Sequence, residues 1–409
     1  MKEVFPMGFW NYPQIDAYPL SKVKDWADLG MTITLSPNFN HEVHDKKLML
    51  DVLDEAQKLG IKLIIFDSRT HWKDAKDKEM YRKKFREAYE DFGKHPATYG
   101  FFVGDEPRTE AEFDNCFAAI TIQHEEAPSL FPHLNLLPYW KGESWLGGKT
   151  LDAWLTDFIA RSGIDFLCYD HYSQMEPEEE GTDNYFLNLR LYDKAAKAAG
   201  IPFWTTLLST GLLRCRCPTQ DDFRWQVSTA AASGCRGILW FFIYDMDRRN
   251  YRNAPISLDG RRTIQYEWLA YELNRFKDNY GELLMSLTFK DSYHLYKSYG
   301  GYPDWQDNAT HKIVRRVWSE HRTNGIVSLF NDKEGREYIL LVNNSKTDAD
   351  LFIMALDPKF KTLCNLHRNG TWEEDFALSH WDAHYKASDI ETQIGVYLAP
   401  GQMEIFRLL

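Results

Sequence analysis

A repeated unit in the first 250 residues constrains the fold of this chain more than any other feature. An apolar run rich in β-formers is followed by polar turn residues, an amphipathic helical pattern, often a glycine, and then the next run. Alternation of strands and helices predicts a parallel sheet. The spacing between successive runs is that of a βα unit. The predicted strands are Val4–Trp10, Met31–Leu35, Lys62–Phe66, Tyr99–Val103, Phe131–Leu137, Asp165–Tyr169, Pro202–Leu207 and Gly237–Tyr244.

The segments between these runs indicate helices. In Lys46–Leu59 the apolar residues recur at helical spacing, on one face. A glycine ends several of the helical patterns just before a strand, where a left-handed C-cap is expected. These glycines are Gly30, Gly60, Gly163, Gly200 and Gly234. Eight units favour closure into a (β/α)8 TIM barrel. The alternative is an open doubly wound sheet, but no GxGxxG sequence follows the first strand.

The pattern changes near residue 285. Helical character ends after Arg262–Lys277, and short runs of alternating apolar and polar residues follow. Turn residues such as Asn331-Asp332 and Pro400-Gly401 separate these runs. The sequence therefore predicts a barrel over residues 1–280 and a small, sandwich-like, antiparallel all-β domain over residues 285–409. The predicted strands of the second domain are Ile326–Phe330, Tyr338–Val342, Leu351–Met354 and Met403–Leu408.

Composition and charge exclude several classes of partner. The net charge is −12 and no long Lys/Arg run occurs, so no nucleic-acid partner is predicted. No window of 18 apolar residues occurs, so no membrane span is predicted. The first residues, MKEVFPMGFW, do not form a signal peptide. A cytoplasmic location is expected by default, and a secreted or periplasmic one if a signal has been removed.

No metal or other cofactor is predicted. Among the six cysteines the close pair is Cys215 and Cys217, whose spacing matches neither a zinc ribbon nor a thioredoxin motif, so buried free thiols are expected. The first strand carries Phe9-Trp10-Asn11 in place of the His-x-His typical of metal-dependent barrel hydrolases. Neither a phosphate-binding glycine loop nor a Gly-x-Ser-x-Gly elbow is present.

In a TIM barrel the chemistry lies at the carboxyl ends of the strands. Carboxylate, amide and aromatic side chains follow several of the predicted strands. Such a mixture suits a polyhydroxylated ligand, because aromatic rings can pack on the apolar face of a sugar. Aromatic residues make up 15% of the chain. The candidate catalytic residues are Glu106, Asp170 and Asp105. The candidate substrate-binding residues are Trp10, Asn38, Asp67, His171, Tyr172, Trp204, Trp240 and Asp245.

The fourth predicted strand carries the most specific motif. Residues 95–107 read HPATYGFFVGDEP. This segment resembles the HP-A-x-x-G-(W/F)-x-x-x-N-E-P segment of clan A glycoside hydrolases, the barrels of retaining β-glycosidases. The resemblance implies that Glu106 is the general acid/base. Asp105 stands where the family has the Asn that holds the sugar 2-hydroxyl.

Three further segments resemble the same clan. Residues 165–172, DFLCYDHY, are similar to its sixth strand, which ends in His-x-Tyr, and Gly237–Tyr244 is similar to its aromatic-rich last strand. Residues 201–207, IPFWTTL, resemble K-P-x-W-x-T-E, whose Glu is the nucleophile in the family. Leu207 occupies that position here. The resemblance implies a carbohydrate substrate and a glycosidase that cleaves a β-linked glycan or glycoside.

Leu207 leaves the second catalytic carboxyl unassigned, because retaining and inverting glycosidases both need two. Asp170 is the first candidate to replace the missing Glu, and Asp245 is another. Alternatively, the substrate supplies its own nucleophile, since Asp105-Glu106 resembles the Asp-Glu pair of β-N-acetylhexosaminidases. A third alternative is a noncatalytic barrel that only binds a glycan. Asp105, Glu106 and Pro107 could also be a helix cap.

Overall fold

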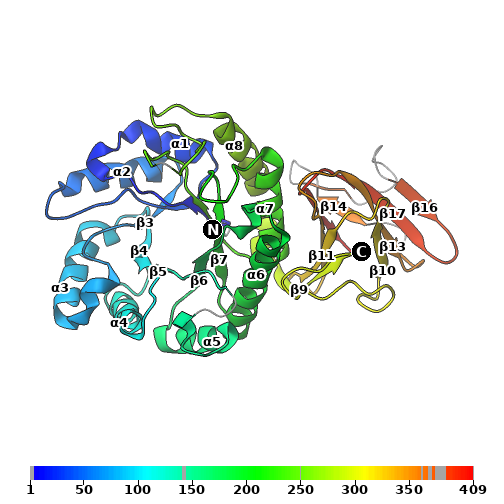
Figure 1. Cartoon of the computed structure of the whole chain (residues 1–409), viewed down its shortest axis with the longest axis horizontal. Coiled ribbons are helices and arrows are strands. Elements are labelled where there is room, and N and C mark those ends of the chain that lie inside the picture. Colours follow the sequence, from blue (N-terminus) through cyan, green and yellow to red (C-terminus); the bar gives the residue numbers. More distant parts are fainter. Residues whose placement is uncertain are drawn as a thin grey trace.

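In the computed structural model, eight parallel strands form a ring enclosed by helices, and an antiparallel β domain packs against one side of the ring (Figure 1). The structure describes residues 4–140, 144–248, 250–360, 363–366, 371–373 and 384–408. Both parts of the predicted fold class are confirmed. The barrel strands are β1 (Met7–Phe9), β2 (Ile33–Leu35), β3 (Lys62–Ile65), β4 (Thr98–Asp105), β5 (Phe131–Asn135), β6 (Leu167–Asp170), β7 (Phe203–Leu208) and β8 (Ile238–Phe241).

Backbone hydrogen bonds close the ring at two seams between four-stranded sheets, one ordered β1-β8-β7-β6 and the other β2-β3-β4-β5. Between β1 and β2 the Thr32 N–H donates to the Met7 carbonyl at 2.8 Å. Between β5 and β6 the Leu136 N–H donates to the Cys168 carbonyl at 2.8 Å. A Cβ at Gly8 would lie 2.2 Å from the Ile33 carbonyl oxygen, so the first seam requires a glycine there.

The helices follow the strands in the predicted order. Helices α5 and α6 end at Gly163 and Gly200, whose φ angles of 62° and 71° form the predicted left-handed C-caps. Such a residue stops the helix and turns the chain toward the next strand. The helices are α1 (Val23–Asp28), α2 (Lys46–Lys58), α3 (Lys78–Ala88), α4 (Glu110–Glu126), α5 (Leu151–Ser162), α6 (Glu179–Ala199), α7 (Gln220–Ala232), α8 (Ile264–Phe276) and α9 (Glu282–Ser286).

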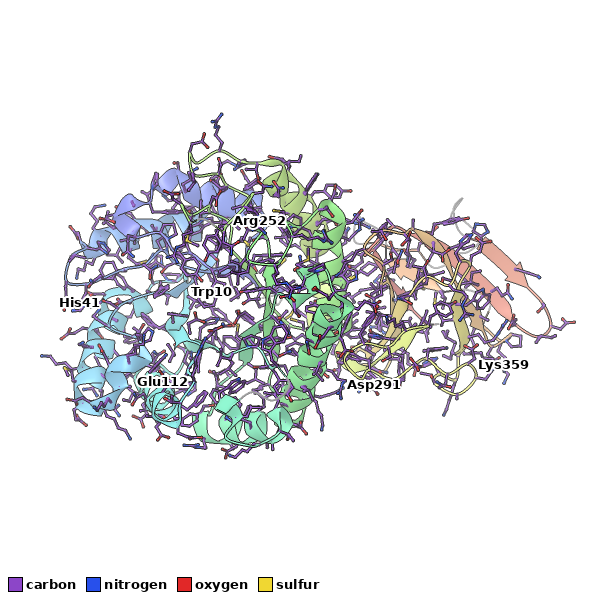
Figure 2. All side chains as sticks on the ribbon, viewed as in Figure 1. Trp10, His41, Glu112, Arg252, Asp291 and Lys359 are labelled. Atoms are coloured by element: carbon purple, nitrogen blue, oxygen red, sulfur yellow. The ribbon has the colours of Figure 1, made fainter. Side chains whose placement is uncertain are left out.

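Aromatic side chains fill the interior of the barrel. Trp10 lies within the ring of strands (Figure 2) and its indole is 5.7 Å from the ring of Phe102. The imidazole of His133 stacks on Phe102 at 5.8 Å, and the ring of Phe166 stacks on Trp204 at 4.3 Å. These side chains are buried, so the barrel is a packed core and its chemistry is confined to the rim.

The second domain consists of two antiparallel sheets that pack face to face around an apolar core. The four strands predicted here correspond to β11, β12, β13 and β18. The sheet order is β10-β13-β17-β16 in one and β15-β14-β18-β12-β11-β9 in the other. The strands are β9 (Thr288–Leu295), β10 (Val314–Ser319), β11 (Gly325–Asn331), β12 (Glu337–Asn343), β13 (Asp350–Leu356), β14 (Cys364–Leu366), β15 (Trp372–Glu373), β16 (His384–Ala387), β17 (Thr392–Leu398) and β18 (Met403–Arg407).

The two domains share one hydrophobic core. Ile326 and Leu340 of the β domain belong to the same buried cluster as the outer face of the barrel. Polar contacts with helix α7 add to this junction: the Trp225 indole N–H donates to Asn344 Oδ1 at 2.8 Å, and the Arg224 Nε–H donates to the Pro400 carbonyl at 2.8 Å. Because the core is continuous, we expect the two domains to unfold together.

Within the part of the chain that the structure describes, no helix has both the length and the apolar character needed to cross a membrane.

Trp225→Ala tests the shared core. Trp225 is 1% exposed, so its removal should lower the free energy of unfolding by about 3–5 kcal/mol, the usual cost of truncating a buried aromatic residue. Chemical denaturation followed by circular dichroism measures this change. Trp268→Ala is the matched control, since Trp268 is only partly buried and should cost less. Equal losses for the two variants would contradict a junction centred on Trp225.

Candidate active site

Three carboxyl groups meet at the carboxyl ends of neighbouring barrel strands. Asp105 ends β4, Glu106 follows it, and Asp170 ends β6. Between them, at the end of β5, Asn135 Nδ2 donates to Asp105 Oδ1 at 3.0 Å and to Asp170 Oδ1 at 2.8 Å. The two acceptor oxygens therefore lie no farther apart than the sum of these distances. The structure thus brings together all three residues that the sequence predicts as catalytic.

The end of β4 is distorted in a way that directs Asp105 and Glu106. The pairing of β4 with β5 shifts between Phe102 and Gly104, as in a β-bulge, a feature that often re-aims side chains at active sites. A Cβ at Gly104 would lie 2.1 Å from Trp72 Cδ1, so the approach of β4 to this ring needs a glycine. Glu106 has a φ of 44°, in the left-handed region that costs a non-glycine residue about 1–3 kcal/mol. Such strain is typical of functional positions.

The environment of the cluster keeps a proton on it. Burial raises the pKa of Asp170 to about 8, and the charges of Glu106 and Asp105 add to this effect. Burial, and then the charge of Glu106, raise the pKa of Asp105 to about 6. Asp105 retains contact with solvent, which accounts for its smaller shift. Neighbouring carboxyls with separated pKa values are typical of sites for acid–base chemistry.

Glu106 has a separate partner. Its Oε2 accepts a hydrogen bond from the Arg108 guanidinium at 2.8 Å. The two side chains are 29% and 66% exposed, and an ion pair so open to water contributes little to stability. A ligand could therefore displace Arg108 from Glu106 at small cost.

Aromatic side chains border the carboxyl cluster. The pKa of Tyr12 is raised by burial and by Asp105 and Asp170, so its hydroxyl lies within their electrostatic field. Tyr172 lies close enough to Asp170 for its hydroxyl to lower the pKa of that carboxyl, against the effect of burial. The ring of Phe241 packs against both tyrosines, at 5.9 Å from Tyr12 and 5.1 Å from Tyr172. Tyrosines and carboxylates together offer what a sugar ring binds, an apolar face and hydroxyl acceptors.

The three tryptophans predicted to bind substrate lie in the protein core, which corrects that prediction. Trp10, Trp204 and Trp240 are at most 3% exposed. Trp10 and Trp204 fill the barrel interior, where the Trp10 indole N–H donates to Thr206 Oγ1 at 3.3 Å. Trp240 packs on the outer side of the sheet, among residues of the helices. Their burial leaves no indole face for a ligand.

Two polar residues predicted to bind substrate hold loops. Asp67 is buried, and its two carboxylate oxygens accept hydrogen bonds from the Arg69 guanidinium, the shortest at 2.7 Å. This ion pair does not support the predicted contact with substrate. Asn38 Nδ2 donates to the Tyr12 carbonyl at 2.9 Å and so holds the loop that carries Tyr12.

The remaining predicted residues have different surroundings. Tyr172 lies beside Asp170, as described above. His171 is 1% exposed, and burial lowers its pKa to about 3. Asp245 Oδ1 accepts a hydrogen bond from the N–H of Met246, the next residue, after β8. Leu207 packs in the core outside the barrel, and the next residue, Leu208, is also apolar and buried, so the end of β7 contributes no carboxyl.

Sequence reasoning missed Asn135, because it extended the fifth strand to Leu137. The strand ends at Asn135, so the predicted end lies two residues beyond the position that contacts the carboxyl cluster. The available signal was the polar Asn within the apolar run HLNLL. A polar side chain there is expected to face a partner at the barrel rim.

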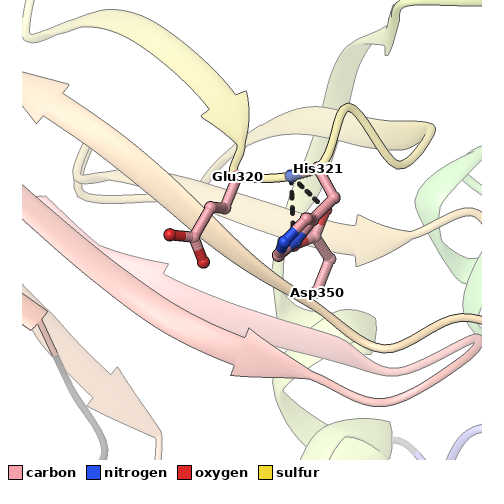
Figure 3. A group of neighbouring side chains, drawn as sticks. All are labelled: Glu320, His321 and Asp350. Carbon is pink, nitrogen blue, oxygen red and sulfur yellow. Dashed lines mark hydrogen bonds and ion pairs between the residues drawn. The ribbon is translucent and has the colours of Figure 1, made fainter.

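One group among the described residues has the composition of a metal site, and it lies in the β domain: Glu320, His321 and Asp350 (Figure 3). Asp350 accepts hydrogen bonds from the His321 ring at 2.9 Å, the His321 backbone N–H at 3.0 Å and the Leu351 N–H at 2.8 Å. These bonds lower the pKa of Asp350 to about 2. The Asp350 carboxylate is thus already bonded to the protein and holds the turn at His321. This structural role explains why the three side chains lie together.

Comparison with known proteins supports the barrel fold. No protein-family model matches the chain, and no curated protein is similar in sequence. A family 5 glycoside hydrolase from Bacteroides vulgatus is similar in structure, with a TM-score of 0.59 and 14% identity over 99% of this chain and 89% of the other. A family 39 glycoside hydrolase from Bacteroides cellulosilyticus has a TM-score of 0.54 and 11% identity over 100% and 81%. A β-galactosidase from Marinomonas, of which the match spans 62%, has a TM-score of 0.54 and 12% identity over 69% of this chain.

Asp170→Asn should stabilise the protein at alkaline pH. The folded pKa of Asp170, about 8, lies above that of an unfolded Asp, near 3.9, so folding takes up a proton between these values. The contribution of Asp170 to stability is therefore complete below about pH 4 and is lost as pH rises to about 8, by at most about 1.4 kcal/mol per pH unit. Thermal unfolding at pH 5 and pH 8.5 measures this change. The stability of the variant relative to the wild type should be higher at pH 8.5 than at pH 5. The same stability difference at both pH values would contradict the burial of a protonated Asp170.

Proposed function

We propose that this protein is a glycosidase that hydrolyses an O-glycosidic bond of a β-linked glycan or glycoside at the Asp105, Glu106 and Asp170 cluster. The observation that carries the proposal is the convergence of three carboxyls at the ends of β4 and β6, joined through Asn135 and bordered by tyrosines. Hydrolysis of a glycoside needs a proton donor and a second carboxylate. The similarity of the fold to glycoside hydrolases is in keeping with this chemistry.

In this proposal Glu106 delivers the proton to the leaving oxygen, the role implied by its motif, and Asp170 is the second carboxylate. The cluster as a whole holds the proton at neutral pH, since the titrations of coupled carboxyls belong to the group. The hydrogen bonds of Asn135 hold Asp105 beside Asp170. Asp105 supports the pair through its charge.

Glu106→Gln tests the donor. Turnover of glycosides with poor leaving groups should fall by about 10²- to 10⁴-fold, while aryl glycosides with good leaving groups should lose much less. Asp170→Asn should abolish the turnover of glycosides with poor leaving groups and of aryl glycosides with good ones. A screen of aryl glycosides and oligosaccharides, with anomeric NMR on each substrate that reacts, provides the assay. Glu110→Gln is the matched control, because this exposed residue lies at the start of α4, outside the cluster.

The opposite pattern, with Asp170→Asn sparing activated substrates, would exchange the two roles. Undiminished turnover of an unactivated glycan by Glu106→Gln would remove Glu106 from the mechanism. Binding of glycans without turnover by the wild type would favour the noncatalytic alternative.

The pH dependence of kcat/KM tests the shared proton. Asp105 is protonated below about pH 6, and Asp170 loses its proton above about pH 8. Since the reaction needs both a proton to donate and a carboxylate, kcat/KM should form a bell between these limits. Initial rates over pH 4–10 measure the profile, and Asp105→Asn should move its acidic limb. Constant kcat/KM across pH 6–10 would contradict a cluster that works with one proton.

Substrate assistance is the second candidate mechanism, and the position of Asp105 favours it. Asp105 adjoins Glu106 and keeps contact with solvent, so it could orient a 2-acetamido group as the attacking nucleophile. Assays with aryl N-acetylhexosaminides distinguish the two mechanisms. If only these substrates react, and Asp105→Asn abolishes turnover while Asp170→Asn spares it, substrate assistance replaces the mechanism with two carboxyls.

A further inference from the structure

Asn135 is bonded to all three residues of the carboxyl cluster. It is 1% exposed, and its Nδ2 donates one hydrogen to each of two carboxyls, at 3.0 Å to Asp105 and at 2.8 Å to Asp170. An amide nitrogen has two hydrogens, so both are used. Asn135, at the end of β5, therefore connects a carboxyl at the end of β4 with a carboxyl at the end of β6.

A contact to the oxygen of the Asn135 amide defines the orientation of the amide. Asn135 Oδ1 accepts a hydrogen bond from the Cys168 thiol, with an S–O distance of 3.6 Å. Burial raises the pKa of Cys168 well above its usual value, so the thiol keeps its proton and can only donate to this oxygen. A flipped amide would direct Oδ1 at the ionised carboxylate of Asp105 and lose that bond. The thiol and the Asp105 carboxylate therefore require the same orientation.

The backbone of Asn135 holds the third carboxyl residue. Its carbonyl accepts a hydrogen bond from the Glu106 N–H at 3.0 Å, and Asn135 pairs with Asp105 in the ladder between β4 and β5. Glu106 has the left-handed φ of 44°, and this bond restrains its backbone beyond the end of β4. One residue thus contacts all three members of the cluster.

We propose that Asn135 is the positioning residue of the site: its amide nitrogen holds one oxygen of Asp105 and one of Asp170, while its carbonyl holds the backbone of Glu106. The catalytic meaning of this arrangement rests on the proposed function. The arrangement itself can be tested without turnover.

Loss of the amide should change the titration of both aspartates. Each hydrogen bond from Asn135 favours the charged carboxylate and lowers its pKa, against the effect of burial. Asn135→Leu, of similar volume but without a donor, should therefore raise both midpoints, by about one pH unit. Asn135→Asp places another carboxyl between the two and should raise them further.

The measurement is a ¹³C NMR titration of the full chain with ¹³Cγ-labelled aspartate, in which Asp105→Asn and Asp170→Asn assign the signals. Asn188→Leu is the matched control. Asn188 is equally buried, and its amide donates to the backbone carbonyls of Tyr139 and Asn184 at 3.0 and 2.9 Å. It should lower stability and leave the midpoints of Asp105 and Asp170 unchanged.

Unchanged midpoints in Asn135→Leu and Asn135→Asp would overturn the proposal and leave Asn135 a purely structural role. If Asn135→Leu does not fold, Asn135→Ser, which is smaller and cannot reach both carboxyls, replaces it in the same titration. The NMR result does not depend on activity, so a protein that hydrolyses no glycoside would refute the proposed function without affecting this test. Where turnover is measured, both limbs of the pH profile should move upward with the midpoints.

Discussion

The hydrogen bonds that close the strands into a ring are the constraint on which the rest of the structure depends. They bring the ends of β4, β5 and β6 to one rim, so that Asp105, Asn135 and Asp170, far apart in the chain, become neighbours. The barrel interior below them is filled with aromatic side chains. A rigid base of this kind can hold carboxyls in an arrangement that their mutual repulsion opposes.

Burial and charge then determine what the rim can do. Asp170 is removed from water beside two other carboxyls, and this favours its protonated form near neutral pH. Asn135 acts in the opposite direction, because each of its bonds favours the ionised form. The balance keeps ionised and protonated carboxyls side by side, which is the requirement of acid–base chemistry on a glycosidic bond.

The β domain contributes to stability at a distance from the rim. Its strands β11 and β12 pack on the side of the barrel that carries α7 (Figure 1). Trp225 of this helix donates a hydrogen bond to Asn344 of the β domain. Helix α7 precedes β8, which carries the Phe241 that borders the cluster. The junction therefore stabilises the same part of the barrel that completes the site.

The order of strands and helices, the glycine caps and the change to β structure near residue 285 could all be predicted from the sequence, because periodicity and turn residues act locally. The motif around Glu106 also pointed to the end of β4, where Asp105 and Glu106 join the carboxyl cluster. Burial was not predictable: Trp204 and Trp240 have the composition of sugar-binding residues, and only tertiary packing decides that they face the core. Asn135 and the raised pKa of Asp170 likewise depend on contacts across three strands, which no local pattern in the chain encodes.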